Sequence, residues 1–312
     1  MLKVRFLFVL IIAQILCLNN IISQNAVTVV KTDFAVRDFN VLGDSIYYLK
    51  KRNAFFHDMK TNVSKDYFIG GYGLKIENVK NTNTIVFASN ELVDTVSSVR
   101  VFNKMKNTFD AVFFHNNAKI LDLAVIPESE LFALSSTDKK IVFVDYSDSP
   151  KFQKTIEIEL DALSRKLICD GNLLYFATDN GEIYQYNFLD YSKLLLHKGN
   201  ELITEFVLTE KSIIYTTIKG NIVKISRENG TKSLLSIENN FISTITRFNL
   251  DKLICGSWSG MIYILSIDEF SIEKELKIHD RSVLKIKKDN NIIYSSSLDK
   301  TIRKWNLNLH MD

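Results

Sequence analysis

The feature that most constrains this chain is a repeat of about 40 residues. An apolar residue marks each copy, and the steps between successive markers are 40, 40, 39, 42, 42 and 44 residues. Copies of this length that contain several short apolar segments predict a β-propeller, because each four-stranded blade buries its faces only by stacking on its neighbours. We therefore predict an all-β, seven-bladed propeller of antiparallel blades. The markers, from the last copy to the first, are Ile302, Ile262, Ile222, Ile183, Ile141, Val99 and Phe55.

The last copy carries the most specific motif. His279 lies four residues before Val283, and the segment Ser295 to Asn306 includes Asp299 and Trp305. This copy resembles the WD-repeat family, although Ile278 and Asn306 replace the Gly and the Asp of that family's pattern. The preceding copy matches in part over 255–262, and the others share only the period and the apolar pattern. The resemblance implies a hydrogen-bonded structural tetrad, which consists of His279, Ser295, Asp299 and Trp305.

One strand of the last blade has to come from elsewhere in the chain. The third strand predicted for this blade covers 301–306, and the six residues after it are too few for a fourth. The segment 26–31 is rich in β-branched residues, as strands are, and no other blade needs it. We expect this segment to pair with 301–306 and close the ring.

The N-terminal segment has the pattern of an export signal. Lys3 and Arg5 precede the 13 residues 6–18, which are apolar apart from Gln14. A membrane span needs about 20 apolar residues, so we expect a signal peptide over 1–24 and a mature propeller over 25–312 with no transmembrane span. The expected location is periplasmic, envelope-associated or secreted. A lipoprotein acylated at Cys17 and an uncleaved anchor remain alternatives.

Charge and cysteine content exclude several functions. The chain has 39 basic and 36 acidic residues, and without Lys3 and Arg5 the balance is 37 to 36, so no basic surface for nucleic acid is expected. Cys169 and Cys255 lie in apolar strand patterns and are expected to be buried free thiols. Neither the Cys and His spacing nor the Asp spacing fits a zinc or calcium site. We expect no metal, no cofactor and a monomer.

One set of residues has the composition of a hydrolase site. Ser295, His279 and Asp299 together contain a hydroxyl, an imidazole and a carboxylate, which nucleophilic catalysis needs in one hydrogen-bonded line. The family resemblance assigns all three to the structural tetrad instead, which also gives these buried polar groups their partners. We therefore expect no catalytic residues and no enzyme activity.

Two features point to a binding function on one face of the ring. The connection between the second and third strands of blade two, 89–97, is longer than its counterparts, although a tolerated insertion explains its length equally well. In WD-repeat proteins the face that holds such connections is a common partner surface. Positions carried over from the resemblance are Trp258, Arg281 and Leu298. The sequence thus favours a protein–protein interaction platform with an unidentified protein partner.

The alternative is a propeller enzyme or a small-ligand-binding protein that uses the central channel. Charged or metal-binding residues converging at the innermost strands would favour it. The sequence shows Arg247, Lys285 and Lys287 there but no carboxylate or histidine cluster, which favours the platform.

Overall fold

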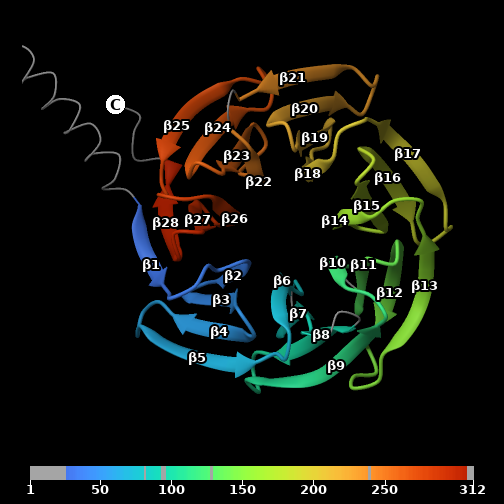
Figure 1. The fold of residues 1–312 in the computed structure, drawn as a ribbon, viewed down its shortest axis with the longest axis vertical. Helices are drawn as coiled ribbons and strands as arrows, with labels where there is room; N and C mark the ends of the chain where they lie inside the picture. The colour runs from blue at the N-terminus through green and yellow to red at the C-terminus, as the bar shows by residue number, and fades with distance from the viewer. Residues whose placement is uncertain (1–25, 81, 93–95, 127–128, 238–239, 308–312) are drawn as a thin grey trace, which may run out of the picture.

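The chain forms a closed ring of seven four-stranded antiparallel sheets. The structure is a computed structural model and describes residues 26–80, 82–92, 96–126, 129–237 and 240–307. Within these ranges the regular structure is almost entirely β, with strands β1 to β28 arranged as the blades of a propeller (Figure 1). This confirms the predicted fold class. The segment predicted as a signal peptide lies outside the described residues.

The strands of the first four blades follow the chain in order. Blade one contains β2 (Phe39–Leu42), β3 (Ser45–Lys50), β4 (Asn53–Asp58) and β5 (Val63–Phe68). Blade two contains β6 (Tyr72–Asn78), β7 (Thr84–Asn90), β8 (Val96–Asn103) and β9 (Thr108–Asn116). Blade three contains β10 (Ile120–Val125), β11 (Leu131–Ser136), β12 (Lys140–Asp145) and β13 (Gln153–Glu159). Blade four contains β14 (Ser164–Asp170), β15 (Leu173–Thr178), β16 (Glu182–Asn187) and β17 (Lys193–Lys198).

The last three blades complete the circle. Blade five contains β18 (Ile203–Leu208), β19 (Ser212–Thr217), β20 (Asn221–Ser226) and β21 (Lys232–Ser236). Blade six contains β22 (Ile242–Arg247), β23 (Lys252–Ser257), β24 (Met261–Ser266) and β25 (Ile272–Lys277). Blade seven contains β26 (Val283–Asp289), β27 (Ile292–Ser297), β28 (Thr301–Asn306) and β1 (Val27–Lys31).

The N-terminal strand closes the ring as predicted. β1 pairs antiparallel with β28, from Val27 opposite Lys304 to Lys31 opposite Thr301. Val30 is buried in a cluster with Val36 and Ile302, so the strand contributes apolar contact as well as hydrogen bonds. The two strands lie side by side at the outer rim (Figure 1). Closure covers the strand edge that β28 would otherwise expose.

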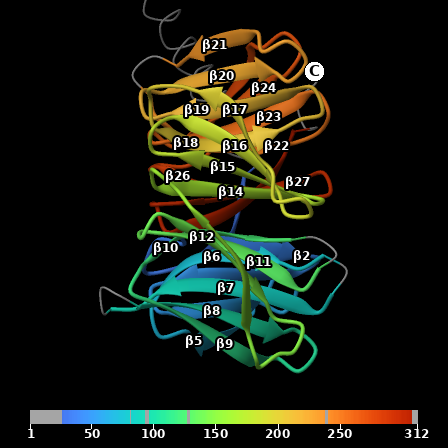
Figure 2. The same ribbon diagram turned by 90° about the vertical axis from the view of Figure 1, so that its right-hand side faces the viewer.

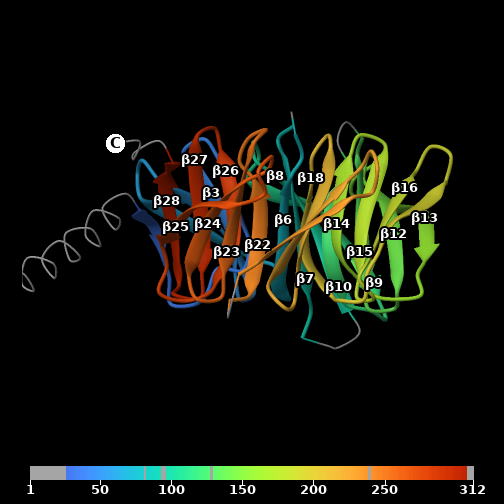
Figure 3. The ribbon, with the colours of Figure 1, turned by 90° about the horizontal axis from the view of Figure 1, so that it is seen from above.

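The core consists of apolar layers between neighbouring blades. Figure 2 shows the blades following one another around the ring, and Figure 3 shows their strands running between its two faces. The marker residues from Val99 to Ile302 are all buried, and so are the large apolar residues three positions after them. A strand covered on both sides needs apolar residues on both faces, which explains the continuous apolar runs of β15 and β19.

The predicted register of blade one was wrong by one residue. The turn between β3 and β4 contains only Lys51 and Arg52, whereas the turn between β27 and β28 contains three residues. The buried positions of β4 are therefore Ala54 and His57, with the same burial pattern as β16, and Phe55 is only half-buried. The polar residue expected at the core position was Asp58, and its neighbour His57 occupies that position instead.

Candidate functional site

The four residues of the expected tetrad lie in one hydrogen-bonded chain in blade seven. His279 Nδ1 lies 2.8 Å from Asp299 Oδ2, and His279 Nε2 lies 2.8 Å from Ser295 Oγ. The indole Nε1–H of Trp305 donates to Ser295 Oγ at 3.1 Å. Because the Asp299 carboxylate only accepts, Nδ1–H donates to it, and Nε2 of the neutral imidazole then accepts the hydrogen of the Ser295 hydroxyl.

The tetrad ties the approach to β26 to the turn between β27 and β28. Burial would raise the pKa of the Asp299 carboxyl, but hydrogen bonds from His279 and Thr301 outweigh it and hold that pKa well below its usual range. Asp299 also accepts the backbone N–H of Thr301 at 3.0 Å. Ser295 has no exposed surface, so its hydroxyl is out of reach of a substrate. This geometry makes the set a buried connection between strands and loops.

Trp258, Arg281 and Leu298 lie on three consecutive connections of one face. Trp258 is in the turn between β23 and β24, and 64% of its surface is exposed. Its ring meets Phe241 edge-on, with ring centroids 5.2 Å apart, and its backbone N–H donates to the Phe241 carbonyl at 2.9 Å. Arg281 precedes β26 and is exposed, and Leu298 is half-exposed in the turn between β27 and β28.

Backbone hydrogen bonds join these three connections. The N–H of His279 donates to the Gly260 carbonyl at 3.1 Å, and the N–H of Leu298 donates to the Ser282 carbonyl at 2.9 Å. Gly260 has a φ of +82°, and a Cβ there would lie 2.2 Å from the His279 carbonyl oxygen. Only glycine permits this approach. The structure thus places the three candidate residues on adjoining, mutually braced loops.

The long connection of blade two is shorter than the sequence suggested. β7 continues to Asn90 and β8 begins at Val96, so the connection is 91–95 and Ser89 and Ser97 are buried strand residues. It is still longer than the three-residue turn between β27 and β28. Leu92 is exposed, while residues 93–95 lie outside the described residues.

The innermost strands contradict the expectation that the channel lacks carboxylates. Each blade places one residue at the same position of its innermost strand, and six of these positions follow directly after a shift in the pairing with the neighbouring strand. In blade one the equivalent is Asp38, whose carboxylate accepts the N–H of Ile76 just as Asp122 accepts the N–H of Leu167. Around the ring the residues are Asp38, Lys75, Asp122, Lys166, Glu205, Thr244 and Lys285.

These seven residues alternate in charge. Positive and negative residues cannot alternate strictly around a ring with an odd number of members. The uncharged Thr244 therefore stands between Glu205 and Lys285. Lys75 Nζ lies 3.0 Å from Asp122 Oδ1, and Lys166 Nζ lies 2.8 Å from Glu205 Oε1. Glu205 Oε2 reaches Lys285 Nζ at 3.3 Å across the threonine blade. We call this set the charged ring.

The ionisation of the charged ring follows from burial and pairing. Burial would raise the pKa of Asp122, but Lys75 and Lys166 outweigh it and lower that pKa to about 2. Burial would likewise lower the pKa of Lys75, yet Asp122 and Glu77 hold it well above its usual value. At Lys285 burial prevails over the attraction of Glu205 and lowers the pKa to about 8. Lys285 is therefore the weakly paired member of the ring.

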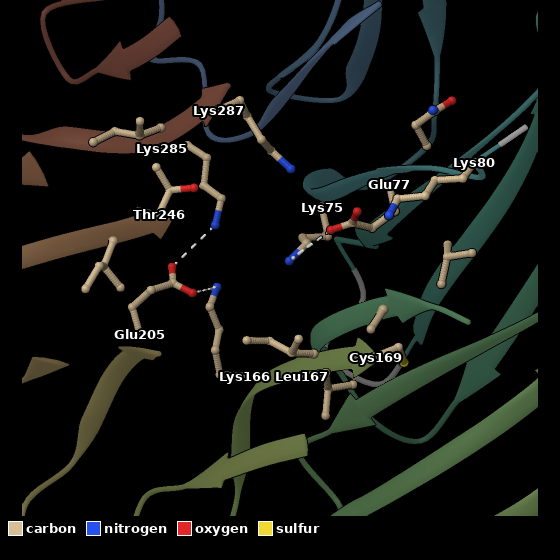
Figure 4. A pocket seen from close by; sticks show the side chains of 16 residues that line it. Lys75, Glu77, Lys80, Lys166, Leu167, Cys169, Glu205, Thr246, Lys285 and Lys287 are labelled. Carbon is tan, nitrogen blue, oxygen red and sulfur yellow. Dashed lines mark hydrogen bonds and ion pairs between the residues drawn. The ribbon is translucent and has the colours of Figure 1, made fainter. Parts of the chain in front are cut away.

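A cavity of about 320 Å³ opens beside the charged ring. Figure 4 shows Lys285 and Lys287 entering it from β26 and Lys75 from β6. Cys169, expected to be buried, is half-buried and lines this cavity, whereas Cys255 is buried in the core. Burial raises the pKa of the Cys169 thiol to about 12. No group of three or more histidine, cysteine or acidic side chains arranged for a metal occurs in the described part of the chain.

Comparison with known proteins supports the fold. No protein-family model and no curated protein matches this chain. The crystal structure of the computationally designed Ika8 protein is similar to it, with a TM-score of 0.64 and 12% sequence identity over 90% of this chain and 98% of that one. At this identity the similarity concerns the fold alone. The described residues contain no helix with the length and hydrophobicity of a membrane span.

Proposed function

We propose that this protein is an exported, monomeric member of the WD-repeat family that serves as a non-catalytic platform for a protein partner. Its partner surface is the face that carries Trp258, Arg281 and Leu298. The observation that carries this proposal is the exposed indole of Trp258 on a turn whose backbone is fixed by Phe241 and by the Gly260 contact.

The chemistry of this face suits protein recognition. Tryptophan and arginine are the residue types that most often dominate binding energy, and rigid placement lowers the entropy that binding must overcome. The edge contact with Phe241 fixes one side of the indole and leaves the rest of its surface open. We expect the partner to offer an apolar pocket for Trp258 and a carboxylate for Arg281.

Family and location rest on separate observations. The hydrogen bonds of His279, Ser295, Asp299 and Trp305 support the WD-repeat relationship, because they join the motif residues of the last copy as that relationship implies. The charged and then apolar N-terminal segment supports export to the periplasm, the envelope or the medium. Determining the N-terminal residue of the purified protein by mass spectrometry tests this, and an intact Met1 on soluble protein would contradict it.

A capture experiment tests the platform. Immobilised protein is exposed to native extract of its own cells, beside the double variant Trp258→Ala/Arg281→Ala. The matched control is Arg247→Ala/Leu250→Ala, which removes the arginine at the end of β22 and an exposed apolar residue from the connection between β22 and β23, on the opposite face. We expect one protein to be retained by the wild type and the control and lost by the first variant. Retention by all three would reject this face.

Small-ligand binding in the channel is the second candidate function. The charged ring and its cavity favour it, because they are the converging charges that a channel site needs.

A further inference from the structure

The cavity of the central channel is lined by more lysines than carboxylates. Five lysines and two glutamates line it, and the other two carboxylates of the charged ring, Asp38 and Asp122, do not line it and accept backbone N–H groups. The lysines therefore remain in excess by one charge. The five are Lys75, Lys80, Lys166, Lys285 and Lys287.

The carboxylates near the cavity are already paired with lysines. Glu205 uses one oxygen for Lys166 and the other for Lys285, and Asp122 is occupied by Lys75 and a backbone N–H. Glu77 Oε1 lies 3.3 Å from Lys75 Nζ. An ammonium group has three N–H donors. Lys285 makes one ion pair, and Lys287 makes none among the residues that the structure describes. Unused donors therefore outnumber unused acceptors around the cavity.

The cavity is large enough to hold a ligand. Its volume of about 320 Å³ corresponds to roughly ten water molecules at about 30 Å³ each. Lys285 and Lys287 approach from β26 and Lys75 approaches from β6, with open space between them (Figure 4). The side chains of Lys75, Lys166 and Lys285 are each less than a fifth exposed, so their charges act in an environment poorer in water than the outer surface.

We propose that this cavity binds a small oxyanion, the phosphate or carboxylate group of a small molecule, between Lys285 and Lys287 on one side and Lys75 on the other. Ammonium donors pair with such groups through short charge-assisted hydrogen bonds. The ion pairs of Glu205 and Asp122 hold Lys166 and Lys75 in place. Lys287 contributes a charge that forms no ion pair with the described residues.

Calorimetric titration of the full-length protein tests the proposal. Sodium sulfate is the probe for a tetrahedral oxyanion and sodium acetate the probe for a carboxylate, each at constant ionic strength set with sodium chloride. Saturable binding of sulfate alone would indicate a ligand with a phosphate group, and saturable binding of acetate alone a ligand with a carboxylate group. Saturable binding of both would show that the site accepts either oxyanion. The absence of saturable heat from either at millimolar concentration would overturn the proposal.

Two variants in β26 distinguish binding at this site from nonspecific attraction of anions to a positively charged surface. Lys287→Gln removes the unpaired ammonium without breaking an ion pair of the described residues, so the fold should persist. Lys288→Gln is the matched control, because its ammonium lies over the Phe248 ring, 4.8 Å from the centroid, and does not line the cavity. We expect about tenfold weaker binding for Lys287→Gln, the loss of one charge-assisted hydrogen bond, and no change for Lys288→Gln. Equal affinities in both variants would refute the site.

Discussion

Replacing Glu205 by glutamine removes the carboxylate on which one half of the charged ring depends. Its two oxygens lie 2.8 Å from Lys166 Nζ and 3.3 Å from Lys285 Nζ, and the Glu205 side chain is only 9% exposed. The amide that replaces it still accepts one hydrogen bond but brings no charge. Two neighbouring ammonium groups are then left in the channel without their shared counter-ion.

The expected destabilisation is large for a substitution of equal size. Removing one partner of a buried ion pair costs about 3–5 kcal/mol, because the other charge stays buried and uncompensated. Among the described residues, Lys166 then retains only Asp122, with a carboxylate oxygen 4.0 Å from its Nζ. We therefore expect Glu205→Gln to lower the free energy of unfolding by about 4 kcal/mol at neutral pH.

The loss should shrink in alkaline solution. Burial lowers the pKa of Lys285 from 10.5 to about 8 against the attraction of Glu205 and Asp38, and the like charges of Lys166 and Lys75 act in the same direction as burial. Between about pH 8 and pH 10.5, Lys285 is largely protonated in the unfolded chain and largely neutral in the folded protein. The contribution of Lys285 to the stability of the wild type therefore increases with pH. Once Lys285 is neutral, Glu205 pairs only with Lys166, and its removal costs less.

Urea denaturation at about pH 7 and about pH 9.5 measures both effects. Glu210→Gln provides the control, because Glu210 is exposed in the connection between β18 and β19. A loss below about 1 kcal/mol at pH 7, the range of an exposed ion pair, would show that the charged ring contributes little. The same loss at both pH values would refute the role assigned to Lys285.

Two further predictions concern blade seven. Deleting residues 26–31 should lower the free energy of unfolding by roughly 5 kcal/mol, because it removes the burial of Val30 and the backbone pairing of β1 with β28; an unchanged melting temperature would show that the ring does not need this strand. His279→Ala should cost about 3 kcal/mol, because Ser295 and Asp299 each lose one hydrogen-bond partner in a buried site. Thermal unfolding followed by circular dichroism measures it, and a change within about 0.5 kcal/mol would mean that the tetrad is dispensable.

The fold was predictable because a propeller repeats its physical constraints. Every blade is covered on both sides, so an apolar marker such as Ile222 recurs at nearly constant spacing and reveals the architecture. The error occurred in blade one, where a two-residue turn shifts the buried positions to Ala54 and His57. A buried histidine does not stand out as a core residue in the sequence, so the pattern gave no means of correcting the register.

The charged ring was not predictable in the same way. Its pairs join residues far apart in the chain, such as Glu205 and Lys285, and nothing in a single strand indicates that its polar residue meets a charge from another blade. The sequence nevertheless contains a signal. In their blades, Asp122, Glu205 and Lys285 each lie two positions after a buried residue, and that residue is the first of the innermost strand. Comparing this position across all copies would have shown the alternation of charge. By contrast, the tetrad residues were identified from one local motif.

The most direct test of the platform proposal is photo-crosslinking inside the cells that produce the protein. A photoreactive phenylalanine analogue replaces Trp258 in one variant and Leu250 in another; both residues are strongly exposed, but Leu250 lies on the opposite face. If the face of Trp258 binds a partner, illumination will give one discrete adduct from position 258 and none from position 250. Equal adducts from the two positions, or none from position 258, would contradict the proposed function.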